Sequence, residues 1–293
     1  MNVINIDTPE DCVRYDATAM NGAEAKSDMD LFSIRSILFL PASNPRAIAK
    51  AREAGADLVV LDLEDAVKPE DKETARLAAV AAAAESWPMP VAIRINGVGT
   101  EWHGPDLVAI THCDADLIVV PRVEEREGLA FVRTQSGKPI AAMIETAKGV
   151  LAAREVTRDC AALIAGTNDL RADLRLPPDA GREPISASLQ MIVLAARAAG
   201  VAVFDGVYNV LDDLDGFARE AEEGRRLGFD GKSLIHPSQI ELCHRAFAPT
   251  DAEIDRAKRL VEAFNGGAER FDNQMIERMH VEQAERLLAR AGR

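Results

Sequence analysis

The chain has 293 residues, 47% of them hydrophobic, which is enough for a sizeable core and excludes a wholly disordered protein. It carries 34 Lys and Arg against 48 Asp and Glu, and the net charge of −14 argues against nucleic acid or a membrane surface as a partner. The longest apolar run, 77–84, is far below the roughly 20 residues that span a bilayer. No signal-peptide pattern is present, and the four cysteines are scattered, so we expect a cytoplasmic protein with reduced thiols.

Residues 1–33 are acidic and only weakly periodic, and we expect them to form a loosely ordered N-terminal arm. The chain then alternates short apolar runs with Ala-, Glu- and Arg-rich stretches of helical character, such as 45–54, 70–85 and 186–199. The apolar runs are 36–40, 58–61, 91–95, 117–120, 140–144, 162–165, 201–204 and 232–235. Several are apolar without alternation, as expected of parallel strands that are covered on both faces.

This alternation predicts an α/β protein with a (β/α)8 TIM barrel over 34–248, and a doubly wound open sheet is the alternative. Thr250 and Glu253 have the spacing of a capping box, which starts a helix that runs to about residue 264. The segment 270–293 also has helical spacing and is too short for a core of its own. We therefore expect 249–293 to be a helical extension that packs on the barrel or on a neighbouring subunit.

Charged and polar side chains follow nearly every apolar run. They lie at 41–43, 62–65, 94, 121–122, 145, 169, 205–206 and 236–237. Because the carboxyl ends of barrel strands converge on one face, these side chains are expected to meet there. Familiar signatures are absent: the GKS string at 231–233 resembles the end of a P-loop, but Arg226 stands where its first glycine is required.

Glu145 and Asp169 follow two consecutive apolar runs, so both carboxylates are expected at neighbouring strand ends. Two carboxylates, completed by water and substrate oxygens, suit Mg²⁺. The alternative is a pair of solvated loop acids.

Arg94 lies inside an apolar strand and needs an anionic partner because it does not lose its proton. It is either a structural ion pair with Glu64 or Asp65, or a bidentate clamp for a substrate carboxylate. The acids at 62–65 repel one another and need a cation or an arginine nearby.

Arg46 and Lys50 lie one helical turn apart, directly after the first strand. Both can point along one face near the mouth of the site, where a phosphate could bind. The alternative is an ordinary solvated helix face.

Taken together, these segments resemble the citrate lyase beta-subunit family, which includes malyl-CoA and citramalyl-CoA lyases within the HpcH/HpaI aldolase group. The resemblance covers 35–291, and its motifs are RSILFLPASNPR, ADLVVLDLEDAVKPEDKETAR, AIRINGVGT, DLIVVPRVE, MIETAKGV, AGTNDL, AARAAGVAVFDGVY, LGFDGKSLIHPSQI and AFAPTDAEIDRAKRL. It implies a TIM barrel with a C-terminal helical extension, assembled as a homotrimer or hexamer with shared active sites.

The resemblance implies that Glu145 and Asp169 hold Mg²⁺, or Mn²⁺ in its place. Arg94 would then hold the carboxylate of a 2-oxo acid, and the backbone around Asn168 and Asp169 would help to seat it. Glu64 and Asp65 would be catalytic acids that orient Arg94 and metal-bound water. The positions that match CoA contacts are Phe39, Arg46, Lys50, Ile235 and His236.

Three positions depart from the family pattern. Ala42 replaces a turn glycine, and Asn168 replaces a glutamate beside the metal aspartate. Glu277 replaces a catalytic aspartate in the C-terminal segment, and Asn273 replaces the glycine of that motif. By resemblance, this segment closes over a neighbouring active site, where Glu277 would move the proton at the thioester α-carbon. The alternative is that the catalytic acid is lost and Glu277 is a surface residue.

The implied activity is a Mg²⁺-dependent carbon–carbon lyase that cleaves a 3-hydroxy-3-carboxyacyl-CoA of the malyl or citramalyl type to an acyl-CoA and a 2-oxo acid. One alternative is a thioesterase for malyl-CoA-like substrates on the same fold. The other is a non-catalytic subunit that binds CoA or an acyl carrier within a larger complex.

Overall fold

The computed structural model of the protein describes residues 29–291. Of the expected N-terminal arm, residues 1–28 lie outside the described residues. The remainder contains a short 3-10 helix, η1 (Leu31–Ser33), in which Leu31 is buried beneath the barrel interior.

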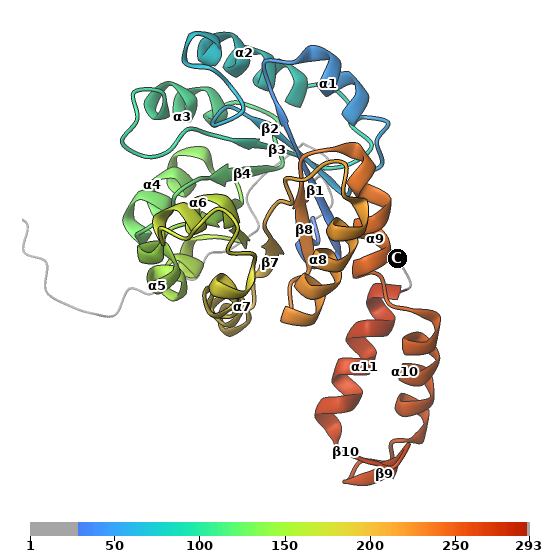
Figure 1. Ribbon diagram of the computed structural model, residues 1–293. Coiled ribbons are helices and arrows are strands. Elements are labelled where there is room, and N and C mark those ends of the chain that lie inside the picture. Colours follow the sequence, from blue (N-terminus) through green and yellow to red (C-terminus); the bar gives the residue numbers. More distant parts are fainter. Residues whose placement is uncertain (1–28, 292–293) are drawn as a thin grey trace, which may run out of the picture.

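Eight parallel strands close into a barrel in the order in which they occur along the chain, and β8 pairs with β1 (Figure 1). The strands are β1 (Ser36–Pro41), β2 (Leu58–Asp62), β3 (Val91–Arg94), β4 (Leu117–Val120), β5 (Ile140–Ile144), β6 (Ala162–Ala165), β7 (Ala202–Asp205) and β8 (Gly231–Leu234). Each lies within one residue of the expected bounds. The predicted TIM barrel is therefore confirmed, and the open doubly wound sheet is wrong.

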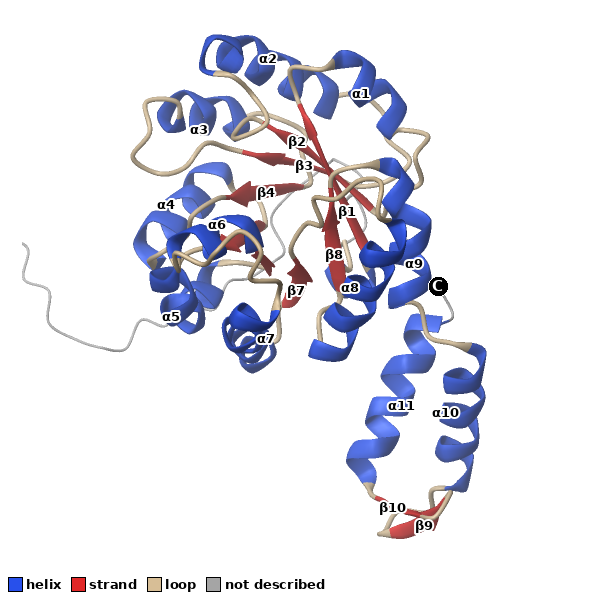
Figure 2. Ribbon diagram, viewed as in Figure 1, coloured by secondary structure: helices blue, strands red, loops and turns tan. Residues whose placement is uncertain are grey.

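An outer ring of helices covers the strands (Figure 2). These helices are α1 (Pro45–Ala51), α2 (Lys72–Ala83), α3 (His103–Thr111), α4 (Arg126–Ser136), α5 (Ala147–Val156), α6 (Thr167–Asp173), α7 (Ser186–Ala199), α8 (Leu214–Leu227) and α9 (Ile240–Phe247). Because side chains alternate along a strand, Ile37 and Phe204 fill the barrel interior, whereas Leu38 and Val203 pack toward the helices. Both sides of each strand are thus buried, which explains why the strands are apolar without alternation.

The C-terminal extension projects away from the barrel as a helical hairpin (Figure 1). It consists of α10 (Asp251–Ala263), β9 (Glu269–Phe271), β10 (Gln274–Ile276) and α11 (Arg278–Ala291). The capping box is confirmed, because the Thr250 hydroxyl accepts the Glu253 N–H and the Glu253 carboxylate accepts the Thr250 N–H. Leu260, Ile276 and Val281 are buried in a small core within this hairpin.

The sequence predicts helical structure over 270–293, but the helix begins only at Arg278. The prediction is therefore wrong for residues 270–277. Residues 269–276 form a β-hairpin whose two turn residues, Asp272 and Asn273, have φ values of 47° and 63°. Left-handed residues at both positions match the twist of the paired strands, and Asn and Asp tolerate this conformation better than other non-glycine residues.

Among residues 29–291, no helix combines the length and the apolar character that crossing a membrane requires.

Candidate active site

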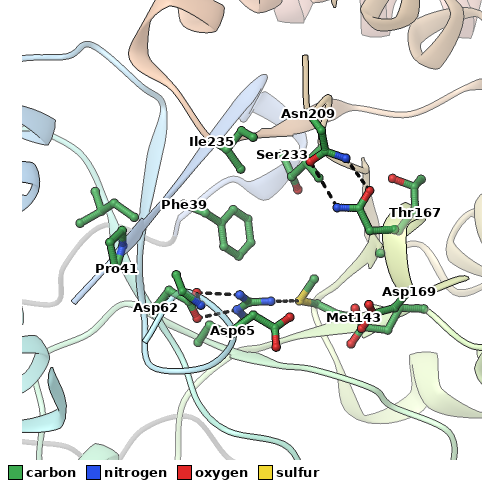
Figure 3. A pocket seen from close by; sticks show the side chains of 18 residues that line it. Phe39, Pro41, Asp62, Asp65, Met143, Thr167, Asp169, Asn209, Ser233 and Ile235 are labelled. Atoms are coloured by element: carbon green, nitrogen blue, oxygen red, sulfur yellow. Dashed lines mark hydrogen bonds and ion pairs between the residues drawn. The ribbon is translucent and has the colours of Figure 1, made fainter. Parts of the chain in front are cut away.

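A cavity of about 440 Å³ opens at the carboxyl ends of the strands (Figure 3). Phe39, Asp62, Arg94, Glu145 and Asp169 line it, and they come from β1, β2, β3, the end of β5 and the start of α6. Its volume suits a small organic ligand. The expected convergence of strand-end side chains is therefore present in the folded chain.

Arg94 is fixed by two acids from the neighbouring strand end. Its Nε and Nη2 each lie 2.6 Å from an oxygen of Asp62, and its Nη1 lies 2.7 Å from Glu64 Oε2. Asp62 also accepts the N–H of Glu64 at 2.9 Å, which orients the Asp62 carboxylate. The bidentate partner is thus Asp62, whereas the sequence reasoning named Glu64 or Asp65 as the ion-pair partner of Arg94 and gave Asp62 only as one of the acids that need a cation nearby. The pairing of β2 with β3 identifies this partner, because Asp62 and Arg94 are paired residues at the ends of these two strands.

The charge state of Arg94 is set by this acidic cage. Burial by itself would lower the pKa of Arg94, but the charge and hydrogen bonds of Asp62 outweigh it and hold the pKa above its ordinary value. Burial raises the pKa of Glu64 to about 8, against the opposing effect of Arg94. The contact between Glu64 Oε2 and Arg94 is not aligned as a hydrogen bond. Nη1 is therefore the guanidinium nitrogen that Asp62 does not hold, and its hydrogen-bond partner is the Met143 sulfur at 3.8 Å.

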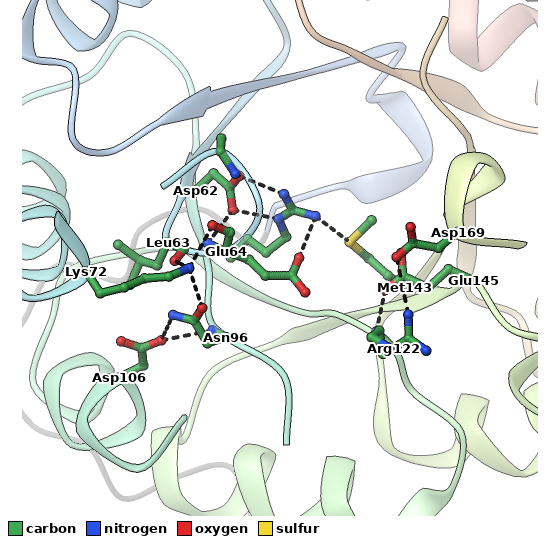
Figure 4. Close-up of polar contacts among 12 residues, drawn as sticks. Asp62, Leu63, Glu64, Lys72, Asn96, Asp106, Arg122, Met143, Glu145 and Asp169 are labelled. Carbon is green, nitrogen blue, oxygen red and sulfur yellow. Dashed lines mark hydrogen bonds and ion pairs between the residues drawn. The ribbon is translucent and has the colours of Figure 1, made fainter. Parts of the chain in front are cut away.

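Glu145 and Asp169 lie on the other side of the cavity (Figure 4). Glu145 is 4% exposed, and its Oε1 accepts the N–H of Arg122 at 2.5 Å. A Cβ at Gly166 would lie 2.3 Å from Glu145 Oε2, so glycine is required for this carboxylate to sit against the start of α6. Asp169 Oδ2 lies 3.5 Å from Nη1 of Arg122.

The electrostatics of this pair fit a hard cation. Burial raises the pKa of Glu145 to about 7, the Arg122 N–H opposes that rise, and the charge of Asp169 adds to it. Two nearby carboxylates, one of them desolvated, gain from a shared counter-charge. No cluster of three or more His, Cys, Asp or Glu suited to a metal occurs among residues 29–291. Two carboxylates completed by water and substrate oxygens form a donor set that suits Mg²⁺.

The remaining sequence-predicted residues divide into two groups. Phe39, Asp65, Asn168 and Ile235 line the cavity, and the Phe39 ring lies 5.4 Å from the Arg94 guanidinium. The Asn168 side chain exchanges hydrogen bonds of 2.7 and 3.3 Å with Asn209, a residue that the sequence reasoning missed (Figure 3). This amide pair joins the start of α6 to the loop after β7.

The other residues expected to contact CoA, together with Glu277, lie outside the cavity lining. Arg46 and Lys50 are exposed on α1. His236 caps the 3-10 helix η5 (Pro237–Gln239), where its Nδ1 accepts the Ser238 N–H. Glu277 is exposed between β10 and α11, at the end of the extension remote from the barrel (Figure 1). Within a single chain, Glu277 does not join the other site residues.

Two charged strand residues, one at the end of β7 and one near the start of β8, belong to a structural network instead of the site. Asp205 and Lys232 point outward from β7 and β8, with the Lys232 Nζ 2.9 Å from Asp205 Oδ2 and 2.8 Å from Glu220 Oε1. Arg182 adds a contact of 2.7 Å to Asp205. Burial would raise the pKa of Asp205, but Lys232 and Arg182 hold it below its ordinary value. The GKS string is thus part of the barrel wall.

Comparison with known proteins places these features in a family. The profile of the HpcH/HpaI aldolase/citrate lyase family matches residues 35–237. The chain is 39% identical over 270 residues to (3S)-malyl-CoA thioesterase of Cereibacter sphaeroides, covering 88% of this chain and 94% of that protein. It is 34% identical over 279 residues to citrate lyase subunit beta of Leuconostoc mesenteroides, covering 87% and 92%.

Solved structures show the same similarity. CitE from Mycobacterium tuberculosis, in complex with magnesium, acetoacetate and coenzyme A, aligns with a TM-score of 0.80 and 31% identity, covering 89% of this chain and 100% of that one. The citrate lyase beta subunit of M. tuberculosis complexed with oxaloacetate and magnesium aligns with a TM-score of 0.68 and 32% identity, covering 75% and 100%.

Proposed function

The chain belongs to the HpcH/HpaI aldolase/citrate lyase family, and from this premise we propose that it is a Mg²⁺-dependent carbon–carbon lyase. Its substrate would be a 3-hydroxy-3-carboxyacyl-CoA of the malyl or citramalyl type, and its products an acyl-CoA and a 2-oxo acid. The observation that carries the proposal is one cavity that holds both a caged guanidinium, Arg94, and a carboxylate pair, Glu145 and Asp169. The relatives solved with magnesium and a keto acid support it.

Each side of the cavity has a part in this reaction. Glu145 and Asp169 would hold Mg²⁺, with Mn²⁺ as a substitute, and the bound ion would polarise the oxygen that becomes the ketone. Arg94 would bind the substrate carboxylate through Nη1, which Glu64 yields in its protonated form. Asp65 lines the cavity and, with Glu64, would orient the guanidinium and nearby water.

Cleavage breaks the bond between the hydroxyl-bearing carbon and the α-carbon of the thioester. The hydroxyl gives its proton to solvent water, and its oxygen becomes the ketone oxygen. The electron pair of the broken bond passes to the α-carbon, which must then be protonated. We assign that proton to Glu277 of a second copy, in a homotrimer or hexamer with shared sites. Glu277 is flanked by Met275 and Met279, which are 70% and 63% exposed, and such an apolar surface suits contact with another chain.

The acyl-CoA would enter past β1 and β8. Phe39 and Ile235 give this side of the cavity an apolar lining for the thioester arm, and Arg46, Lys50 and His236 would meet the CoA phosphates outside. The described cysteines Cys113, Cys160 and Cys243 are free, in keeping with the cytoplasmic location that we propose.

A thioesterase is the second candidate, favoured by the 39% identity to (3S)-malyl-CoA thioesterase and by the distance of Glu277 from the cavity of its own chain. In that reaction, water adds to the thioester carbonyl, the carbon–sulfur bond breaks and the thiol of CoA leaves. Incubation of malyl-CoA and citramalyl-CoA with Mg²⁺, followed by product analysis, separates the two candidates. Acetyl-CoA with glyoxylate or pyruvate supports the lyase, whereas free CoA with malate or citramalate supports the thioesterase.

A further inference from the structure

Arg122 touches both carboxylates of the candidate cation site, one through its backbone and the other through its side chain (Figure 4). Its N–H donates to Glu145 Oε1 at 2.5 Å, and its Nη1 lies 3.5 Å from Asp169 Oδ2. Arg122 lies just after the end of β4 and lines a second cavity beside the candidate site. None of the roles derived above uses it.

The backbone of Arg122 is held in a conformation that arginine seldom adopts. Its φ is 48°, in the left-handed region, and among residues 29–291 only Arg175, Asp272 and Asn273 are other non-glycine residues with positive φ. Such conformations persist where the surrounding structure enforces them. In this conformation Arg122 donates its N–H to Glu145, which fixes one oxygen of that carboxylate.

The side chain of Arg122 is held loosely by comparison. It is 52% exposed, and Asp169 is 38% exposed, so their contact of 3.5 Å is a long ion pair in partial contact with water. Arg122 also lines a second cavity, of about 460 Å³, together with the acids Glu64, Asp65 and Glu124. The guanidinium therefore has acidic groups within that cavity to which it can turn when it leaves Asp169.

We infer that Arg122 is a positioning residue of the cation site whose guanidinium is an exchangeable counter-cation for Asp169. Its N–H keeps Glu145 in place throughout, and its side chain yields Asp169 to a divalent cation and turns into the neighbouring acidic cavity. A guanidinium and a dication carry like charges, so the two compete for one carboxylate. This inference rests on the proposed role of Glu145 and Asp169 as cation ligands.

Calorimetric titration of the full-length protein with Mg²⁺ tests the exchange. Arg122→Gly keeps the N–H and suits the positive φ, but it removes the competing charge, so we expect Mg²⁺ to bind about three- to tenfold more tightly. The gain should shrink as salt screens the charge. Arg122→Lys retains a cation and should stay within about twofold of the wild-type affinity.

Arg175→Gly is the matched control, because Arg175 has the same residue type and a φ of 56° but is exposed away from the carboxylates. It should leave the affinity for Mg²⁺ unchanged. With circular dichroism and oligomeric state preserved, an Arg122→Gly affinity equal to or weaker than wild type overturns the exchange. If the wild-type protein itself binds no Mg²⁺, the carboxylate site and this inference both fail. If the wild-type protein binds Mg²⁺ and Arg122→Gly binds it with the same affinity, only this inference is overturned.

Discussion

Asp62 and Arg94 stand directly across from each other at the carboxyl ends of β2 and β3, joined by two contacts of 2.6 Å. Asp62 is 1% and Arg94 8% exposed, so the pair lies out of water beneath the cavity. This relationship fixes the direction of the guanidinium and leaves Nη1, next to Glu64 and Met143, as the one nitrogen that Asp62 does not hold.

Removing one partner of the Asp62–Arg94 pair should destabilise the folded protein. Asp62→Asn leaves a buried guanidinium with reduced compensation, and we expect the free energy of unfolding to fall by about 3–5 kcal/mol. Urea denaturation measures it. Glu222→Gln is the control, since Glu222 pairs with Arg226 at 3.3 Å on the surface and its removal should cost at most about 1 kcal/mol. Equal losses in the two variants would contradict the structural role of Asp62.

Arg94→Lys should impair the reaction although it preserves the charge. A lysine lacks the planar fork that binds Asp62 and leaves a third nitrogen for a substrate carboxylate, so we expect kcat/KM for the 2-oxo acid in the condensation direction to fall at least about tenfold. Steady-state kinetics with glyoxylate and pyruvate measure this. Arg46→Lys, on exposed α1, should leave the 2-oxo acid KM unaltered. An unchanged KM in Arg94→Lys would remove Arg94 from carboxylate binding.

Glu145→Gln and Asp169→Asn should each weaken Mg²⁺ binding and abolish turnover, since each replaces a charged oxygen ligand by a neutral amide. Calorimetry and product analysis report binding and turnover separately. Glu155→Gln, which alters an exposed carboxylate paired with Arg158 at 2.8 Å, is the control. Full activity of both site variants in the presence of EDTA would refute the metal site.

The pH dependence of stability should carry a signature of Glu64. Burial raises the pKa of its carboxyl from 4.5 to about 8. A group whose folded pKa is raised contributes its full stabilisation below its unfolded pKa and loses it as the pH rises through the folded value. Wild-type stability should therefore fall relative to that of Glu64→Gln between pH 4.5 and about 8.

Urea midpoints of the wild type and Glu64→Gln, measured at several pH values across this window, test the Glu64 prediction. Glu85→Gln serves as a control because Glu85 is 62% exposed and pairs with Arg52 on the surface. Two parallel curves for wild type and Glu64→Gln would show that the carboxyl titrates normally.

Glu277 should act only between chains. Neither Glu277→Gln nor Glu145→Gln is expected to be active alone, but chains of the two variants mixed in equal amounts should recover about a quarter of wild-type turnover, since one site in four then has both carboxylates. Mass spectrometry must first verify the mixed oligomers. A fully active Glu277→Gln oligomer, or no recovery on mixing, would remove Glu277 from the mechanism.

The linear sequence was sufficient for the barrel. Its strands are continuous apolar runs, because both faces of each strand are covered, and the bounds of the helix Ser186–Ala199 and the Thr250 capping box were local signals of the same kind. Such features depend on residues that are close together in the chain. The hairpin at 269–276 was missed because its apolar residues fit helical spacing equally well, and the turn at Asp272 and Asn273 decides between the two.

The composition of the site was only partly contained in the sequence. Local order placed Glu145, Asp169 and Arg94 near strand ends, but only strand register gave Arg94 its partner Asp62. The direction of each side chain, into the barrel or out of it, was also decided only by the structure. Lys232 points outward and belongs to the barrel wall, so it is not a site residue. Pairings between residues tens of positions apart depend on where closure of the barrel places neighbouring strands, and this is a property of the tertiary structure that no local pattern encodes.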